Sequence, residues 1–158
     1  MSEFGRLALA AGLDPAKIGL ELIITTGERQ QPILKKFLAE TFQCRIIDEY
    51  GCTEVGIIAF ECPEGKMHIA NHNMIVEIVN PETGRPVNPG DIGEVTITEL
   101  HGYAMPLIRY RIGDLARIDN DVCSCGRQSP LMSGIVGRVS ELIQTPDGRS
   151  VAAAILDY

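Results

Sequence analysis

Residues 45–54 read Arg-Ile-Ile-Asp-Glu-Tyr-Gly-Cys-Thr-Glu, a short apolar run followed at once by polar and acidic side chains. The run Arg45-Ile46-Ile47 predicts a short buried strand, and the residues after it predict a loop. In an open α/β sheet, ligands bind at the carboxyl ends of the strands. This loop is therefore the first place to look for a binding site.

The side chains of this loop suit a nucleotide phosphate with magnesium. Tyr50 offers a flat aromatic face, and Gly51 lets the backbone come close to a ligand because it has no Cβ. Thr53 can donate to a phosphate oxygen, and the carboxylate of Glu54 supplies the hard oxygen that magnesium prefers. The alternative interpretation is an ordinary polar loop with Tyr50 half buried, since short motifs often match by chance.

Upstream of this stretch the pattern is that of a parallel sheet. Residues 20–26 (Leu-Glu-Leu-Ile-Ile-Thr-Thr) predict a buried strand, and residues 31–42 predict a helix because their apolar side chains recur at helical spacing. A further helix is expected over residues 5–13. The order helix, strand, helix, strand predicts an α/β fold with a βαβ fragment over residues 1–56.

Downstream of residue 56 the sequence predicts a β-rich, distorted barrel-like unit over residues 57–144. Residues 93–99 alternate apolar and polar side chains with period two, as a half-exposed strand does. Asp147-Gly148 predicts a hairpin turn. The other strand-like segments are residues 55–60, 67–69, 74–79, 106–110, 115–118, 135–136 and 141–144.

Composition excludes several classes of protein. The 158 residues are 45% hydrophobic and 22% charged, which is ordinary for a globular protein. A net charge of −7 argues against a nucleic-acid partner, and no apolar run has the length of a membrane span. Five cysteines, an odd number, without a secretion signal favour a reducing cytoplasm over a disulfide framework.

Three more stretches carry candidate ligand-binding residues. Gly27 and Glu28 end the strand parallel to residues 45–47, so we expect them beside the loop; alternatively, Thr26 is a helix N-cap and Glu28 an early helical acid. Asp114 follows a glycine at a strand end, where a carboxylate can accept hydrogen bonds from ribose hydroxyls, although a plain Gly-Asp turn is also consistent. Arg138 can pair with phosphate or ribose oxygens, or be a surface arginine.

Taken in order, these stretches resemble the core motifs of the adenylate-forming enzymes, which include the acyl-CoA synthetases. The resemblance is to the phenylacetate–CoA ligase-like branch and covers nearly the whole chain from about residue 6. The motifs that carry it are Tyr50-Gly51-Cys52-Thr53-Glu54, Gly27-Glu28, Arg111-Ile112-Gly113-Asp114 and Gly137-Arg138. Glu61-Cys62-Pro63 and the run from Cys123 to Arg127 are similar to segments of that branch.

The resemblance implies an ATP-dependent acid–CoA ligase that adenylates a carboxylic acid, such as phenylacetate, and transfers it to coenzyme A. It implies adenine contacts from Glu28, Glu49 and Tyr50, with Gly27 and Gly51 as further nucleotide-binding positions. It implies catalytic roles for Thr53, which contacts the phosphate, and for Glu54, which binds magnesium. It also implies ribose contact from Asp114, and ribose or phosphate contact from Arg138. Apolar residues Val55, Ile57 and Ile58 fit an apolar or aromatic acid. A homodimer is left open.

Two departures from the family pattern limit what we expect of the chain alone. Ser140 and Glu141 stand where the hinge residue of the family is usually Asp or Lys, and residues 145–158 would begin the hinge and C-terminal region. No phosphate loop ending in Lys precedes residue 20, and no lid with a catalytic Lys follows residue 144. We expect the chain to be a middle portion of a larger enzyme that does not adenylate by itself.

The cysteines suggest a second site. Cys62, His68, Cys123 and Cys125 belong to one β-rich unit and offer the sulfur and nitrogen ligands that structural zinc prefers. Some relatives in the branch carry such a metal, whereas the Cys-x-Cys spacing is shorter than usual and free thiols are the alternative. Two other functions therefore stay open: a zinc-stabilised interaction module, and a nucleotide-binding domain without chemistry.

Overall fold

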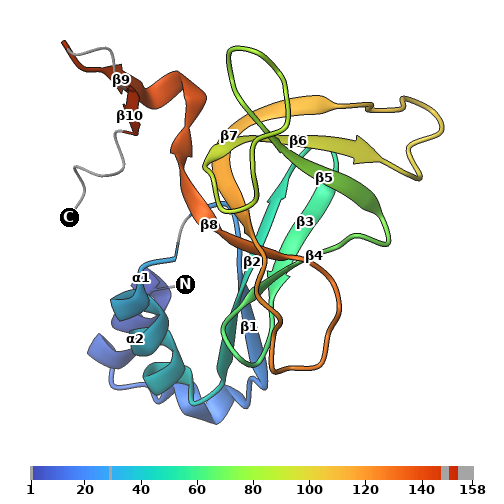
Figure 1. The fold of residues 1–158 in the computed structure, drawn as a ribbon. Helices are drawn as coiled ribbons and strands as arrows, with labels where there is room; N and C mark the ends of the chain where they lie inside the picture. Colours follow the sequence, from blue (N-terminus) through green and yellow to red (C-terminus); the bar gives the residue numbers. More distant parts are fainter. Residues whose placement is uncertain (1, 29, 147–149, 153–158) are drawn as a thin grey trace.

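The computed structural model describes residues 2–28, 30–146 and 150–152, and its first part is the expected βαβ fragment (Figure 1). The elements of this part are α1 (Ser2–Ala10), η1 (Pro15–Ile18), β1 (Leu22–Thr25), α2 (Pro32–Phe42) and β2 (Arg45–Cys52). β1 and β2 pair in parallel, with Ile23 opposite Ile46. Pro32 starts α2 because its fixed φ suits the first helical position.

α2 covers β1 and β2 with an apolar face. Leu38 and Phe42 lie on one side of the helix and form a buried cluster with Ile23 and Ile46. This packing, rather than helical propensity alone, stabilises a helix of 11 residues. The carboxyl ends of β1 and β2 consequently meet at one edge of the sheet.

The remaining strands extend the same sheet in an antiparallel manner. They are β3 (Gly56–Glu61), β4 (Met67–Ile69), β5 (Met74–Val79), β6 (Gly93–Glu99), β7 (Tyr110–Asp119) and β8 (Leu131–Arg138). The sheet has eight strands in the order β1-β2-β3-β4-β8-β7-β6-β5. After β8, η2 (Val139–Glu141) leads to a separate pair, β9 (Leu142–Gln144) and β10 (Ser150–Ala152).

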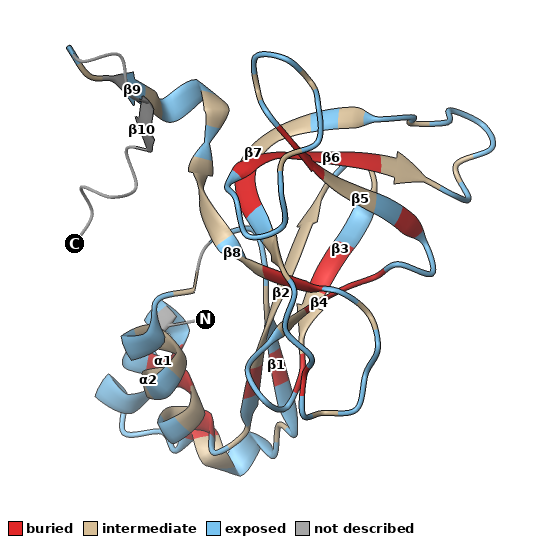
Figure 2. Cartoon of the chain, viewed as in Figure 1, coloured by how far each residue is buried: buried red, intermediate tan, exposed pale blue. Residues whose placement is uncertain are grey.

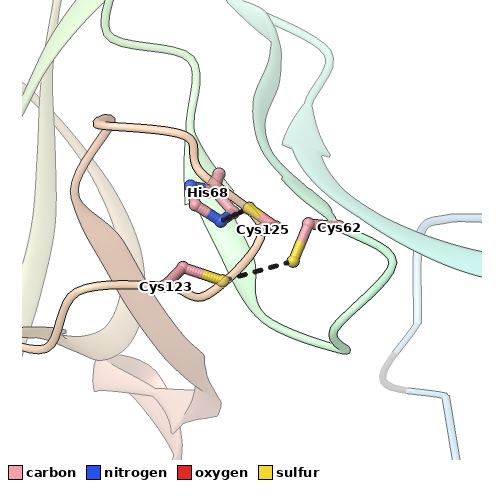
Figure 3. A group of neighbouring side chains, drawn as sticks. All are labelled: Cys62, His68, Cys123 and Cys125. Atoms are coloured by element: carbon pink, nitrogen blue, oxygen red, sulfur yellow. Dashed lines mark hydrogen bonds between the residues drawn. The ribbon is translucent and has the colours of Figure 1, made fainter.

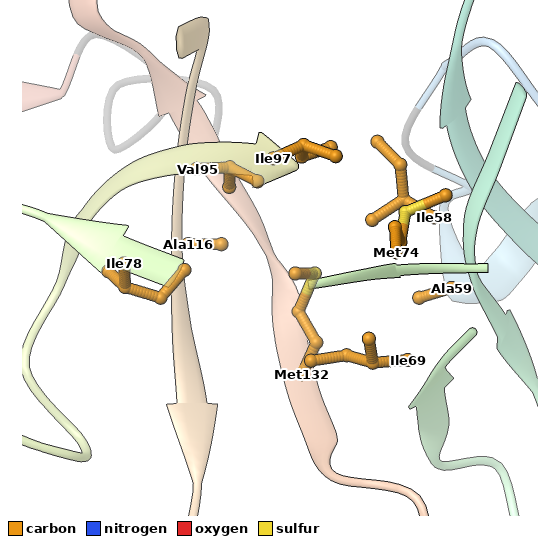
Figure 4. Close-up of a cluster of buried hydrophobic side chains, with 9 residues drawn as sticks. All are labelled: Ile58, Ala59, Ile69, Met74, Ile78, Val95, Ile97, Ala116 and Met132. Atoms are coloured by element: carbon orange, nitrogen blue, oxygen red, sulfur yellow. The ribbon is translucent and has the colours of Figure 1, made fainter. Parts of the chain in front are cut away.

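The β-rich part has its own core, whose buried residues lie along β3, β4, β5, β6, β7 and β8 (red in Figure 2). Ile58, Val95 and Ile97 are fully buried there, and Met74 and Met132 join them (Figure 4). The loops that connect these strands, such as residues 80–92 and 100–109, are mostly exposed. The α/β fold class with a mostly β-sheet second part is confirmed.

The structure corrects several sequence predictions. β2 runs through Asp48–Cys52, which we expected as a loop, because residues 49–52 pair with β3. Residues 106–109 are not strand, and Gly113-Asp114 is not a turn between two strands: both residues lie within β7, where Gly113 has φ +83°. The N-cap of α2 is Gln31, so Thr26 does not cap this helix.

Three remaining expectations have different outcomes. Asp147-Gly148, the predicted hairpin turn, lies outside the described residues. Among the described residues, no helix has the length and apolarity needed to cross a membrane. The domain boundary near residue 56 stays a prediction. The strands on either side of it, β2 and β3, are neighbours in the same sheet.

Candidate functional site

A cleft of about 260 Å³ lies where the carboxyl ends of β1 and β2 face β7 and the end of β8. It gathers residues from five separate stretches of the sequence. Its lining consists of Gly27, Glu28, Asp48, Glu49, Tyr50, Gly51, Met67, Asp114, Met132, Gly134, Ile135, Gly137, Arg138 and Glu141. Seven of the residues predicted to bind nucleotide are therefore in one place: Gly27, Glu28, Glu49, Tyr50, Gly51, Asp114 and Arg138.

Asp114 contacts two other residues of the cleft lining. Tyr50 Oη donates a hydrogen bond of 2.9 Å to Asp114 Oδ2, and Arg138 Nε lies 3.3 Å from Asp114 Oδ1. Asp114 and Arg138 are direct partners across β7 and β8, whereas Tyr50 comes from β2. The sheet thus holds a hydroxyl, a carboxylate and a guanidinium in one connected group.

Burial keeps Tyr50 neutral. Loss of contact with water raises the pKa of its hydroxyl, and the negative charge of Asp114 raises this pKa further. Tyr50 therefore stays a hydrogen-bond donor at any physiological pH. Burial also raises the pKa of Asp48, which a hydrogen bond of 3.1 Å from Thr25 Oγ1 to its Oδ1 partly opposes.

Thr53 and Glu54 lie outside this lining. Both are exposed in the turn between β2 and β3. The carboxylate of Glu54 has a pKa below its usual value, because its own backbone N–H, the Cys52 thiol and the Tyr110 hydroxyl stabilise the charge. Tyr110 Oη donates to Glu54 Oε1 over 3.2 Å, so this carboxylate is ionised and oriented, as a magnesium ligand needs to be.

A charged pair behind the cleft was not anticipated from the sequence. Glu61 on β3 forms an ion pair with Lys35 of α2, and its Oε2 accepts a 2.8 Å hydrogen bond from the backbone N–H of Asp48. The ion pair joins α2 to β3, and the hydrogen bond joins β3 to β2 at Asp48, which lines the cleft. Lys35 and Glu61 are 26 residues apart in the sequence, and Asp48 and Glu61 are 13 apart, so a short window of sequence could not indicate either contact.

Met67 and Met132 also line the cleft without having been predicted. They lie opposite each other on β4 and β8. An apolar residue in a strand is normally predicted to lie in the core, and both methionines do also contact the core cluster. A further correction concerns Ile58: it is fully buried in that core, so it is not available to an acid substrate.

The predicted metal ligands converge, as Figure 3 shows. The ligand atoms of Cys62, His68, Cys123 and Cys125 all lie within 4.8 Å of one another. Cys62 Sγ and Cys123 Sγ are 3.7 Å apart, and Cys125 Sγ is 3.3 Å from His68 Nε2. Two sulfurs bound to one tetrahedral zinc ion at about 2.3 Å lie roughly 3.8 Å apart. The distance between Cys62 Sγ and Cys123 Sγ therefore suits a shared ion.

The surroundings of the cluster suit a metal too. His68 is fully buried, and its Nδ1 is 3.0 Å from Ser129 Oγ and 3.3 Å from Ser129 O. A proton on Nδ1 then leaves Nε2 free toward the sulfurs, which is how metal-binding histidines are usually oriented. The backbone N–H of Arg127 helps to lower the pKa of the Cys125 thiol.

Comparison with known proteins assigns the family. Residues 6–103 match the sequence model of the AMP-binding enzyme family. The chain belongs to the AMP-binding enzymes. This confirms the resemblance to the adenylate-forming enzymes, and the matched residues contain two of the four motifs, at residues 27–28 and 50–54.

Among curated AMP-binding relatives, the phenylacetate-coenzyme A ligase of Thermus thermophilus is 31% identical over 136 residues, which are 84% of this chain and 31% of the relative. The enzyme of the same name from Escherichia coli is 30% identical and covers 84% of this chain and 30% of the relative. The chain thus spans under a third of the length of these two ligases.

A solved AMP-binding structure matches the fold closely. An open conformation of 2-hydroxyisobutyryl-CoA ligase, in complex with 2-HIB-AMP and CoA, superposes with a TM-score of 0.87 and 25% identity. The match covers 98% of this chain and 37% of that protein. Nearly all of the chain is therefore similar to about a third of an acid–CoA ligase.

Proposed function

We propose that the chain is the nucleotide-binding part of an ATP-dependent acid–CoA ligase that adenylates an aromatic acid resembling phenylacetate. The observation that supports this most is the convergence of Glu28, Tyr50, Asp114 and Arg138 in one cleft. Relatives named phenylacetate-coenzyme A ligase and a structural neighbour bound to an acyl-AMP and CoA point to the same chemistry.

Each residue has a part in the proposed reaction. Gly27, Glu28 and Glu49 line one side of an adenine site, and the ring of Tyr50 offers its face. Asp114 accepts hydrogen bonds from the ribose hydroxyls, as acids in other nucleotide sites do. Arg138 balances the negative charge near ribose and phosphate.

The chemistry itself needs no side-chain nucleophile. A substrate carboxylate attacks the α-phosphate of ATP and pyrophosphate leaves; the thiol of coenzyme A then attacks the acyl carbon and AMP leaves. The protein accelerates such steps by positioning the reactants and stabilising charge. Magnesium, when bound, neutralises phosphate charge, and the ionised Glu54 is the residue that would hold it, with Thr53 donating to the phosphate beside it.

Isothermal titration of the 158-residue chain with AMP tests the proposed site. We expect saturable one-site binding, which Asp114→Ala abolishes and Asp121→Ala does not alter. Asp121 is an exposed acid outside the cleft lining, so it is a matched control. If the chain is an interaction module without a nucleotide site, AMP should bind to none of the three proteins: wild type, Asp114→Ala and Asp121→Ala.

A chimera tests the enzymatic part of the proposal. The chain replaces the matching segment of the Escherichia coli phenylacetate-coenzyme A ligase, and acid-dependent ATP–pyrophosphate exchange is measured with phenylacetate and with 2-hydroxyisobutyrate. We expect exchange with phenylacetate in the chimera and none with the isolated 158-residue chain. AMP binding without exchange for any carboxylic acid would instead favour a nucleotide-binding domain that lacks chemistry.

We also propose that Cys62, His68, Cys123 and Cys125 hold one structural zinc ion. Their distances, the burial of His68 and its contact with Ser129 support this. Elemental analysis should give one zinc per chain, lost in Cys125→Ser but retained in Cys44→Ser, whose thiol lies outside the cluster. A folded, metal-free protein with a melting temperature unaffected by chelator contradicts the zinc site.

We also propose a cellular location and an oligomeric state. None of the five cysteines, all of which lie in the described part of the chain, forms a disulfide, and this fits a reducing compartment such as the cytoplasm. A homodimer is a further proposal, and size-exclusion chromatography with light scattering measures it directly. The isolated chain eluting only as a monomer at micromolar concentration would contradict it.

A further inference from the structure

The carboxylate of Asp114 is held at both of its oxygens. Tyr50 Oη donates to Oδ2 at 2.9 Å, and Arg138 Nε lies 3.3 Å from Oδ1. Each carboxylate oxygen can accept about two hydrogen bonds, so each still has one acceptor site for a ligand. Two neighbouring acceptor sites on a fixed carboxylate match two neighbouring hydroxyls of a ribose.

The two partners of Asp114 differ in how firmly they are held. The Arg138 side chain is 66% exposed, whereas Tyr50 contacts the buried core of the β-rich unit. Solvent screening and side-chain motion weaken the ion pair that a long, exposed arginine makes, so Arg138 orients the carboxylate poorly. The tyrosine ring has few rotatable bonds, and its hydroxyl is the better-defined partner.

The hydrogen bond from Tyr50 also joins distant parts of the sheet. β2 and β7 are not neighbours: β3, β4 and β8 lie between them in the strand order. The contact therefore fixes the carboxylate of β7 relative to the edge formed by β1 and β2, across the width of the cleft. A change in that contact changes the distance between the expected ribose and adenine subsites.

We propose that the hydroxyl of Tyr50 is a positioning group that orients Asp114 for the 2′- and 3′-hydroxyls of a ribose. It makes the cleft selective for ribonucleotides over deoxyribonucleotides. This inference rests on the proposed nucleotide site. It assigns the hydroxyl a role separate from that of the ring, whose face is available to adenine in either kind of nucleotide.

Tyr50→Phe removes the hydroxyl and keeps the ring. Affinities for AMP and for 2′,3′-dideoxy-AMP are measured by isothermal titration on wild type, on Tyr50→Phe and on Tyr103→Phe. Tyr103 is 87% exposed and outside the cleft lining, so it controls for the loss of any tyrosine hydroxyl. Melting temperatures of all three proteins are compared, and we expect the variants to fold because one hydrogen bond is a small part of a domain's stability.

Wild type and Tyr103→Phe should bind AMP at least about tenfold more tightly than the dideoxy compound, since the ribose hydroxyls bond to a charged acceptor. In Tyr50→Phe we expect the ratio of the affinity for AMP to the affinity for dideoxy-AMP to fall to roughly threefold or less. AMP binding should weaken, while dideoxy-AMP binding should be nearly unchanged. A purely structural role weakens both ligands equally. An unchanged ratio in Tyr50→Phe therefore overturns this inference.

A second measurement uses wild type alone and does not depend on the variant. With ¹³Cζ-labelled tyrosine, the Tyr50 resonance should move more on binding AMP than on binding dideoxy-AMP, since only the ribose hydroxyls share its acceptor. Equal movement overturns the inference. Absence of saturable AMP binding to wild type overturns the proposed nucleotide site and this inference together, so the two failures are distinct.

Discussion

Gly51 lies where β2 approaches β3, and we predict that Gly51→Ala destabilises the fold. A Cβ built on Gly51 would lie 2.4 Å from the carbonyl oxygen of Gly56 and 3.1 Å from its carbonyl carbon. An ordinary carbon–oxygen contact is about 3.3 Å or more, so the two strands would have to separate by roughly 0.9 Å. Backbone atoms cannot rotate away as a side chain can.

The magnitude follows from that displacement. Cys52 and Gly56 pair directly in the β2–β3 ladder, and the register already shifts between Tyr50 and Gly51. Overpacking of this kind costs about 1–3 kcal/mol. With a urea dependence of about 2 kcal/mol per molar, the unfolding midpoint should fall by roughly 0.5–1.5 M.

Gly134→Ala is the matched control. Gly134 also lines the cleft, its φ lies outside the left-handed region, and no atom lies within 4 Å of a Cβ built there. This substitution should leave stability unchanged or raise it by about 0.4–1 kcal/mol, because alanine restricts the unfolded chain. Equal urea midpoints for Gly51→Ala and wild type would refute the close approach of the two strands.

Three further predictions concern charged groups and hydroxyls, two of them in the cleft and one at Glu54, outside the cleft lining. Tyr50 keeps its proton when folded but loses it near pH 10 when unfolded, so the free energy of unfolding should fall above about pH 10 by up to about 1.4 kcal/mol per pH unit. Urea titrations at pH 9–11 should show a shallower fall for Tyr50→Phe; equal slopes would contradict the burial of the hydroxyl. Arg138→Gln should change stability by less than about 1 kcal/mol because the side chain is 66% exposed, yet weaken AMP binding about tenfold in calorimetry, and unchanged affinity would contradict its proposed role. Tyr110→Phe should reduce the magnesium-dependent part of ATP affinity about two- to fivefold through loss of the hydrogen bond to Glu54, and an unaltered magnesium dependence would count against Glu54 as the ligand.

The βαβ part of the fold was predictable because its signals are local. The apolar runs at residues 20–26 and 45–47 and the helical spacing between them correspond to β1, β2 and α2. The end of β2 was mispredicted because Asp48–Cys52 carry polar side chains, and pairing with β3 outweighs that local signal. Tertiary pairing of this kind is not visible in a short window of sequence.

The β7 region shows a second limit. Gly113 reads as a turn residue, but its φ of +83° is accommodated inside a strand of ten residues. Arg109 adopts a left-handed φ of +51°, and its guanidinium forms an ion pair with Glu77 on β5. That partner is 32 residues away, so the local sequence could not indicate this contact.

The candidate sites were predictable to different degrees. Residue type, together with a place in one β-rich unit, selected the four members of the Cys and His cluster, although the spacing of Cys123 and Cys125 was unusual. Motif order selected Asp114 and Arg138, which are cross-strand partners. Met67 and Met132 were not found, because an apolar strand residue looks the same in a core and in a cleft wall.

Amide chemical-shift mapping of the ¹⁵N-labelled chain during an AMP titration tests the nucleotide site most directly. We predict saturable shifts at the glycine amides of the cleft, Gly27, Gly51 and Gly137. The amides of Lys36 and Ala39, on α2 and outside the cleft lining, should stay in place. Saturable shifts confined to α2, or no saturable shifts at any AMP concentration up to the millimolar range, would contradict the proposed site.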